Sequence, residues 1–200
     1  MKLEVENINK AFRSSNIISD MSFSINDNEY LCIVGDSGCG KTTLLNIITG
    51  MLKPDSGIIK IDDIRVAKRR WSKIRNTTIG YLPCGNSLIE SLTIYDNIKC
   101  AAKLYNKSDY DISALLKELK IDGITKAHPS EISSGEYKRA CFARVLSLDT
   151  NFLVLDEPTS NLDSNSAGLI INILNKLSSK KGIIIATHDN RLIQGKSIHL

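Results

Sequence analysis

The sequence predicts an α/β fold built around a mostly parallel sheet. Short runs that are apolar, rich in β-branched residues and bounded by Gly or Asp indicate strands buried on both faces: Leu31–Val34, Phe152–Leu155 and Gly182–Ala186. Helical patterns lie between or beside these strands, at Lys41–Ile48, Tyr137–Leu148 and Ser166–Leu177. Such alternation along the chain is typical of a parallel sheet covered by helices.

Two other stretches follow different patterns. Lys2–Ile8, Met21–Ile25 and later Gly57–Asp62 alternate weakly and indicate antiparallel strands. The middle, about 85–150, is rich in helical pattern with polar breaks such as Ser108-Asp109. We therefore expect one domain over residues 1–200, in which the α/β core carries an antiparallel β subdomain and an inserted helical subdomain.

Composition narrows the class of protein. The chain has 200 residues, 42% of them hydrophobic, and a net charge of +4, which is too small to indicate a nucleic-acid partner. We expect no membrane span, because the sequence lacks the run of ~18 apolar residues that a span needs, and we expect no signal peptide. The five cysteines are odd in number and form no CxxC pair, which favours reduced thiols in a cytosolic protein.

The first run that carries chemistry follows the strand at Leu31–Val34. Gly35–Thr42 matches G-x-x-x-x-G-K-[ST] and opens a predicted helix, the context that separates a nucleotide-binding P-loop from a chance glycine loop. Its backbone N–H groups and the helix N-terminus suit phosphates, Lys41 suits the β- and γ-phosphates, and the Thr42 hydroxyl suits Mg²⁺. The candidate phosphate-binding residues are Gly35, Asp36, Ser37, Gly38, Cys39, Gly40, Lys41, Thr42 and Thr43.

A second candidate motif ends the strand Phe152–Leu155. Asp156 and Glu157 follow it directly, and the carboxyl ends of parallel strands line the ligand crevice of such sheets. Asp156 is thus placed to bind Mg²⁺ together with Thr42, and Glu157 to act as the general base for a water attacking the γ-phosphate. The alternative is a solvated turn, which the upstream phosphate loop makes less favoured.

Further motifs resemble those of ATP-binding cassette (ABC) ATPases, in the family's order and over essentially the whole chain. Ile132–Arg139 resembles the signature motif, Pro158–Asp163 the D-loop, and Ala186–Asp189 the segment with the switch histidine, His188. Phe12 matches the aromatic residue that stacks on adenine. The segments Ile79–Leu82, Leu92–Ile98 and Asn161–Asp163 are most similar to the branch that powers lipoprotein release and macrolide or antimicrobial-peptide export.

The resemblance implies a mechanism and partners. An ATP-hydrolysing subunit of this kind binds ATP and Mg²⁺ and dimerises around two ATP molecules, with itself or with a second ATPase chain. The signature residues Ser133, Ser134, Gly135 and Glu136 would clamp the nucleotide of the partner chain. His188 would contact the γ-phosphate and Asp163 would communicate across the interface. A transmembrane permease on a separate chain would hold the subunit at the cytoplasmic face of the membrane, docked on Cys84 to Leu92.

Some positions depart from the family pattern. Cys84 stands where a Gln normally contacts the Mg²⁺–water cluster, and a thiol is a poor Mg²⁺ ligand, so either a water or Asn86 would substitute. Ser134 and Glu136 alter the signature, and Glu136 brings negative charge near a phosphate. Two alternatives therefore stay open: a pseudo-ATPase that only senses nucleotide, and a non-transport ABC protein.

A basic run lies outside these motifs. Arg65, Lys68, Arg69, Arg70, Lys73 and Arg75 surround Trp71, with no acidic residue from Ile64 to Arg75. Such a run is most often a solvated face, although it is also the composition of a surface that touches nucleic acid or anionic lipid.

Overall fold

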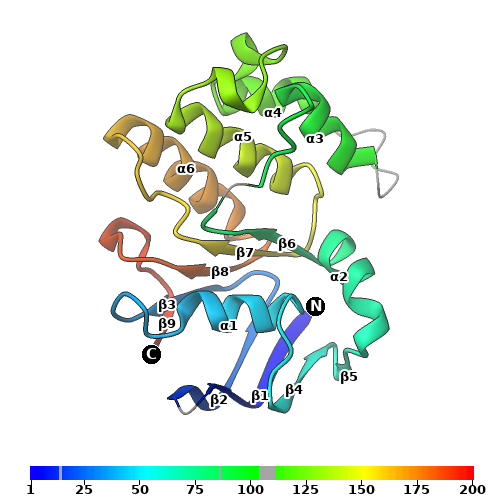
Figure 1. Ribbon diagram of the computed structural model, residues 1–200, viewed down its shortest axis with the longest axis vertical. Helices are drawn as coiled ribbons and strands as arrows, with labels where there is room; N and C mark the ends of the chain where they lie inside the picture. Colours follow the sequence, from blue (N-terminus) through cyan, green and yellow to red (C-terminus); the bar gives the residue numbers. More distant parts are fainter. Residues whose placement is uncertain (14, 86, 104–110) are drawn as a thin grey trace.

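The structure is a computed structural model that describes residues 1–13, 15–85, 87–103 and 111–200. Two sheets form its framework (Figure 1). The described strands are β1 (Lys2–Phe12), β2 (Ser15–Asn26), β3 (Tyr30–Val34), β4 (Ser56–Ile61), β5 (Ile64–Arg65), β6 (Ile79–Leu82), β7 (Phe152–Asp156), β8 (Gly182–Ala186) and β9 (Lys196–His199). The α-helices are α1 (Lys41–Ile48), α2 (Trp71–Thr77), α3 (Ile94–Lys103), α4 (Ile112–Glu118), α5 (Ser134–Leu146) and α6 (Ser164–Leu177). Short 3₁₀ turns are η1 (Lys68–Arg70), η2 (Asp122–Ile124), η3 (Pro129–Glu131) and η4 (Asn190–Leu192).

The second sheet is parallel throughout, in the order β6-β7-β8-β3-β9. Asp156, the last residue of β7, pairs with Ala186, the last residue of β8, which in turn pairs with Ile33 of β3. The carboxyl ends of the central strands therefore reach one edge of the sheet together. This arrangement, with an antiparallel sheet and helices around it, confirms the predicted α/β fold class.

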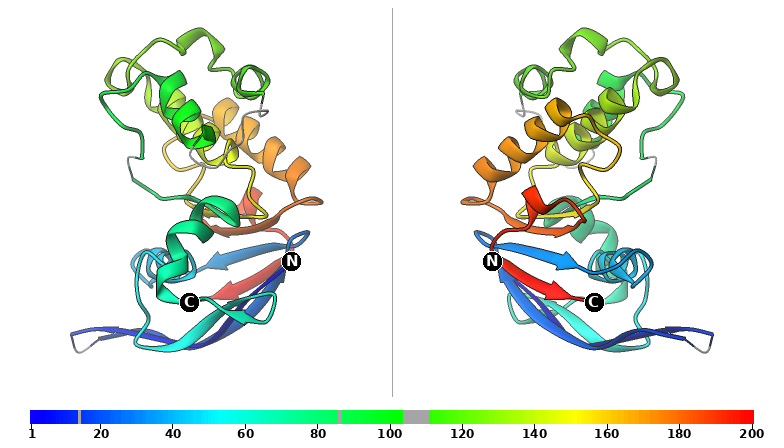
Figure 2. Two further views of the ribbon diagram at one scale, coloured as in Figure 1. Left: turned by 90° about the vertical axis from the view of Figure 1, so that its right-hand side faces the viewer. Right: turned by 90° about the vertical axis from the view of Figure 1, so that its left-hand side faces the viewer.

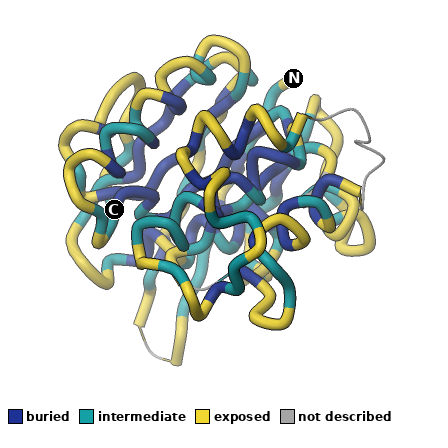
Figure 3. The backbone as a smooth tube through the Cα atoms, turned by 90° about the horizontal axis from the view of Figure 1, so that it is seen from above, coloured by how far each residue is buried: buried dark blue, intermediate teal, exposed yellow. Residues whose placement is uncertain are grey.

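Alternate residues of the central strands feed two hydrophobic cores. Leu153 and Leu155 of β7 point to the core shared with α3, α4, α5 and α6, whereas Phe152 and Val154 point to the core shared with α1 and the antiparallel sheet. The period of two is that of a pleated strand buried on both faces. Figure 3 shows the outcome, with buried segments in the interior and exposed segments at the periphery.

The antiparallel sheet has the order β2-β1-β4-β5, and its first two strands form a long hairpin that projects from the body of the molecule (Figure 2). The observed strands β1 and β2 are longer than the ranges that the weak alternation predicted, Lys2–Ile8 and Met21–Ile25. Register shifts between Val5 and Ala11 explain this, because irregular pairing breaks the inside–outside alternation that the sequence shows.

Helices α3, α4 and α5 occupy the chain between β6 and β7, where the helical insertion is expected, while Ser108 and Asp109 lie outside the described residues. The basic run forms η1 and α2. The Trp71 ring packs on Gly50, just after α1, and Arg75 Nη1 donates to the backbone oxygens of Thr49 and Gly50 at 3.3 Å each. Among the described residues, no helix combines the length and the apolar character needed to cross a bilayer.

Candidate nucleotide-binding site

The phosphate loop connects β3 to α1 at the carboxyl edge of the parallel sheet. Gly40 precedes the helix with a φ of 111°, a left-handed conformation that favours glycine. A Cβ at this position would also lie 2.6 Å from Ile17 Cγ2 of the neighbouring hairpin. The sequence therefore needs glycine here on two counts, and α1 begins at Lys41 as the pattern predicts.

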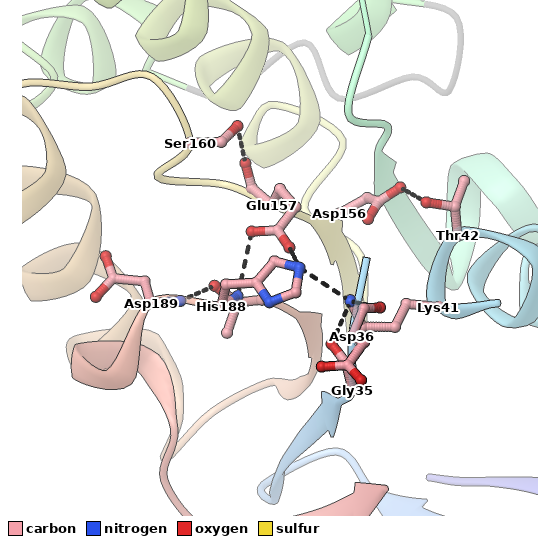
Figure 4. Close-up of polar contacts among 10 residues, drawn as sticks. Gly35, Asp36, Lys41, Thr42, Asp156, Glu157, Ser160, His188 and Asp189 are labelled. Atoms are coloured by element: carbon pink, nitrogen blue, oxygen red, sulfur yellow. Dashed lines mark hydrogen bonds and ion pairs between the residues drawn. The ribbon is translucent and has the colours of Figure 1, made fainter. Parts of the chain in front are cut away.

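Lys41 is buried and its ammonium lies at the centre of the candidate site (Figure 4). Its Nζ donates to the carbonyl oxygens of Gly35 and Asp36, at 2.7 and 2.9 Å, and lies 3.1 Å from His188 Nε2. The Lys41 ammonium is therefore within hydrogen-bonding distance of the imidazole of His188. The loop thus folds back on its own lysine.

Asp156 and Thr42 meet across the sheet edge, where Thr42 Oγ1 donates to Asp156 Oδ2 at 2.7 Å. Asp156 is 1% exposed, and burial raises the pKa of its carboxyl despite the opposing effects of the Thr42 hydrogen bond and of nearby Lys138 and Lys41. The pair supplies one hydroxyl and one carboxylate oxygen. Such a donor set fits Mg²⁺, which binds through one or two carboxylates and completes its shell with phosphates and water.

Glu157 and His188 face each other at the ends of β7 and β8. Glu157 Oε2 accepts from the His188 backbone N–H at 3.3 Å, and Glu157 Oε1 lies 3.5 Å from His188 Nε2. Glu157 has a φ of 47°, in the region that non-glycine residues seldom occupy, while its own N–H donates to Ala186 O at 2.9 Å. The sheet edge therefore holds this carboxylate in a strained position beside the lysine and the histidine.

These side chains line one pocket of about 670 Å³. Besides the groups described above, its walls hold Cys84, whose side chain is exposed, and three residues that the motif reading did not assign: Thr159, Ser160 and Asp189. Thr159 Oγ1 donates to Asp189 Oδ2 at 2.9 Å, and Arg191 beside Asp189 lowers the pKa of that carboxyl to about 2. The sequence did carry a signal for these residues, since each lies within a segment that resembles a family motif: Thr159 and Ser160 within Pro158–Asp163, and Asp189 within Ala186–Asp189.

The phosphate-loop residues Ser37, Gly38, Gly40, Lys41, Thr42 and Thr43 are among the lining residues, and Gly35 and Asp36 contact Lys41. Cys39 is half-buried in the same loop, and its N–H donates to Asp36 O at 3.3 Å. The structure thus brings together in one chain the phosphate loop, Cys84, the two carboxylates and the histidine.

The signature residues stand elsewhere, at the N-terminus of α5. Ser133 caps the helix, and Glu136 Oε2 accepts from both the Ser133 hydroxyl, at 2.6 Å, and the Ser133 N–H, at 2.9 Å. Ser134 is exposed, and a Cβ on Gly135 would lie 3.4 Å from Ser166 Oγ and 3.8 Å from Asp163 Oδ2. The signature therefore neighbours the D-loop aspartate, which caps α6 by accepting from the N–H groups of Asn165 and Ser166.

Two other candidates are Phe12 and Asn86. Phe12 ends β1 with 47% of its surface exposed, and the Lys10 ammonium lies 5.3 Å from its ring centroid. Asn86, the alternative Mg²⁺ ligand, lies outside the described residues. Neither placement tests the role assigned to the residue.

Comparison with protein families matches residues 18–160 to a model described as ABC transporter. The lipoprotein-releasing system ATP-binding protein LolD of Treponema pallidum is 34% identical over 95% of this chain and 90% of its own length. LolD of Buchnera aphidicola is 32% identical over 94% of this chain and 88% of its own length. The ABC transporter ATP-binding protein YtrE of Bacillus subtilis is 31% identical over 88% of this chain and 80% of its own length.

Solved structures agree with this match. The ATP-binding cassette MJ0796, in a dimeric post-hydrolysis state bound to ADP and Pi, superimposes with a TM-score of 0.90 and 27% identity over 99% of this chain and 94% of that one. A further dimeric structure of the same cassette gives the same TM-score at 26% identity. The likeness extends over both sheets and the helical region.

Proposed function

The chain belongs to the ABC transporter family of ATP-binding proteins, and we propose that it hydrolyses ATP to drive a membrane permease encoded on a separate chain. The observation that carries this proposal is the convergence of Lys41, Thr42, Asp156, Glu157 and His188 on one pocket. We extend the proposal to organisation, with residues 1–200 as one nucleotide-binding domain and about 85–150 as its helical subdomain.

ATP enters by replacing contacts that the chain makes with itself. Lys41 exchanges the carbonyl oxygens of Gly35 and Asp36 for β- and γ-phosphate oxygens, and the phosphate loop binds through its N–H groups and the N-terminus of α1. This exchange also releases His188 Nε2 from Lys41. His188 Nε2 would then contact the γ-phosphate.

Hydrolysis uses Glu157 as the general base. The water oxygen forms a bond to the γ-phosphorus, the bond from that phosphorus to the β,γ-bridging oxygen breaks, and the water proton moves to the Glu157 carboxylate. Thr42 and Asp156 would hold Mg²⁺, which supplies charge neutralisation on the β- and γ-phosphates when bound. Thr159 and Ser160 line the pocket on the D-loop side and complete its wall.

The second half of each site comes from another ATPase chain. In this chain the Ser133–Glu136 segment lies beside Asp163 and Ser166 and is not among the residues that line the pocket, and the resemblance to the family implies that it meets the γ-phosphate bound by a partner subunit. The dimeric state named for MJ0796 supports the same arrangement here. We propose an ATP-dependent dimer, of this chain with itself or with a second ATPase chain, at the cytoplasmic face of the membrane.

The substrate class follows from the relatives. The LolD proteins are named for lipoprotein release, and on that basis we propose that this chain powers the release or export of a lipoprotein, peptide or antimicrobial compound. The permease would dock on the segment from Cys84 to Leu92, which leads from the pocket towards α3.

The test is ATPase activity of the purified chain with Mg²⁺. We expect Glu157→Gln to lower kcat by at least ~100-fold while ATP binding persists, because only the base is lost. Glu118→Gln is the matched control, since Glu118 is an exposed carboxylate paired with Lys176 on α6. Wild-type turnover no greater than that of Glu157→Gln, with and without a permease, would establish the nucleotide-sensing pseudo-ATPase instead.

A further inference from the structure

The basic run has a charge balance unlike the rest of the molecule. The twelve residues from Ile64 to Arg75 carry six positive charges and no negative charge, whereas the whole chain carries +4. The other 188 residues are therefore net negative by two charges. A positive surface of this density is unexplained by nucleotide binding, because the run lies on β5, η1 and α2, away from the carboxyl edge of the sheet.

Five of the six basic side chains are exposed and have no hydrogen-bond or ion-pair partner among the described residues. Arg75 satisfies carbonyl groups at the end of α1. The other five are exposed and make no side-chain hydrogen bond or ion pair with the residues that the structure describes: Arg65, Lys68, Arg69, Arg70 and Lys73. We call these five residues the basic surface.

Exposed apolar side chains flank the basic surface. Ile64 is 62% exposed and Met51 is 61% exposed, the two highest values among the exposed large hydrophobic residues that the structure describes. Ile64 lines a hollow of about 420 Å³ with Arg65, Arg70 and Lys73, and Met51 lines a hollow of about 690 Å³ with Arg65 and Lys68. The two hollows adjoin, because both include Arg65 and Val66.

Two acidic residues at the margins, Asp62 and Asp55, already accept hydrogen bonds from other parts of the chain. Asp62 Oδ1 accepts from the Lys2 N–H at 2.7 Å, and the Asp55 carboxylate accepts from Lys10 Nζ at 2.6 Å and from the Ala11 N–H at 2.8 Å. These contacts turn the Asp55 and Asp62 carboxylates towards other partners. The basic surface is left to attract an anion from outside the chain.

We propose that the basic surface binds the anionic headgroups of a lipid bilayer. Lys and Arg beside exposed aliphatic side chains suit an interface where phosphates lie above acyl chains. A nucleic acid would gain from an aromatic ring free to stack, but the Trp71 ring packs on Gly50. The left view of Figure 2 shows α2 on the same side of the molecule as α3, which follows the proposed permease-docking segment.

The function of such a contact would be to orient the subunit. A permease holds it at one point, and a second contact to lipid would restrict its rotation about that point. Lipid binding requires no ATP turnover, so this inference stands or falls separately from the proposed ATPase activity.

The test is flotation of the full chain, without nucleotide, with phosphatidylcholine vesicles and with vesicles that also contain phosphatidylglycerol. We expect flotation only with the anionic vesicles, weakened by high salt. Lys68→Gln, Arg69→Gln and Lys73→Gln together should lower the partition coefficient about 100-fold, since each charge contributes roughly a fivefold effect. ATPase activity should not change, which also reports that the variant is folded.

The matched control replaces three exposed lysines of the helical region, Lys117, Lys120 and Lys126, by Gln, which gives the same net charge. We expect it to float like the wild type. Equal loss in both variants, absence of flotation in the wild type, or displacement by millimolar inorganic phosphate would overturn the proposal. So would binding of a single-stranded RNA at a salt concentration where the vesicles do not bind, which would assign the surface to nucleic acid.

Discussion

Individual residues of the site are held by contacts that ATP and its metal would replace. Lys41 binds carbonyl oxygens of its own loop, and Asp156 binds Thr42, both away from bulk water. The Lys41 ammonium and the Asp156 carboxylate thus each have a hydrogen-bond partner within the chain, which avoids the cost of leaving them unsatisfied. The remaining cost is electrostatic, because a buried carboxylate lacks the hydration of an exposed one.

Asp156 makes that cost measurable. Because burial raises its pKa, its ionisation opposes folding as the pH rises from the ordinary value of 3.8 through the raised value, and the penalty persists at neutral pH. We expect Asp156→Asn to raise the Tm of the nucleotide-free chain at pH 7, and the difference from the wild type to shrink as the pH falls to about 4.

Thermal melts at several pH values check this, with and without MgATP. MgATP should raise the Tm of the wild type more than that of Asp156→Asn, because the variant lacks a carboxylate ligand. A variant that melts below the wild type at pH 7 without nucleotide would contradict the assigned role of burial.

At the scale of elements, the parallel sheet is tied to its surroundings by close backbone approaches. The end of α1 is one: Gly50 has a φ of 66° and its Cα faces the Trp71 ring, while Arg75 Nη1 donates to the carbonyl groups of Thr49 and Gly50, just after α1. A cation near a helix C-terminus also complements the helix dipole. The Trp71 ring and the Arg75 guanidinium thus hold α2 against the end of α1, and Ile74 packs against the same hydrophobic core.

Gly50→Ala tests this junction. A Cβ there would lie 2.0 Å from Trp71 Cδ2, and the left-handed backbone adds further strain. We expect the free energy of unfolding to fall by about 2–4 kcal/mol, from overpacking and backbone cost together.

Urea denaturation provides the measurement and Gly168→Ala the control. Gly168 lies within α6 with open space around its Cα, so alanine there should stabilise the chain by up to about 1 kcal/mol. If both variants lose stability equally, the Trp71 contact does not hold α2 in place.

At the scale of the whole molecule, the chain has two separate groups of phosphate-binding candidates. One is the pocket that the phosphate loop lines, and the other is the cradle formed by the signature residues Ser133–Glu136 at the N-terminus of α5. The Glu136 carboxylate occupies that cradle by accepting both Ser133 donors, and the Ser133 contacts lower its pKa, so it is ionised at neutral pH. A γ-phosphate from a partner subunit would compete with this carboxylate for Ser133. Glu136 therefore opposes the ATP-dependent dimer that we propose.

Glu136→Gln should strengthen that dimer, because the amide retains an acceptor for Ser133 but removes the negative charge. We expect the dimer dissociation constant in ATP to fall roughly fivefold. Sedimentation in a Glu157→Gln background, which prevents turnover, measures it. Glu131→Gln, at an exposed carboxylate in the preceding turn, is the control, and a dimer no tighter than this control would refute the opposition by Glu136.

The sequence by itself determined the fold class, the central strands and the positions of the phosphate loop and the acidic motif. The three central strands could be predicted because strands buried on both faces are apolar without interruption: Leu31–Val34, Phe152–Leu155 and Gly182–Ala186. Helix α1 could be predicted because the phosphate-loop motif places a glycine turn directly before it. These signals are local, because they depend only on residues close together in the sequence.

Only the tertiary structure decided the rest. Strands β6 and β9 border the parallel sheet but lack a strong pattern of their own, since pairing with β7 and β3 stabilises them. Likewise α2 was read only as a basic run, and the inward contacts of Trp71, Ile74 and Arg75 became apparent only in the structure. The contacts of Lys41 with His188, of Thr42 with Asp156 and of Glu136 with Ser133 depend on side-chain directions. Spacing predicts that such residues converge, but which atoms meet is set by the packing of distant segments.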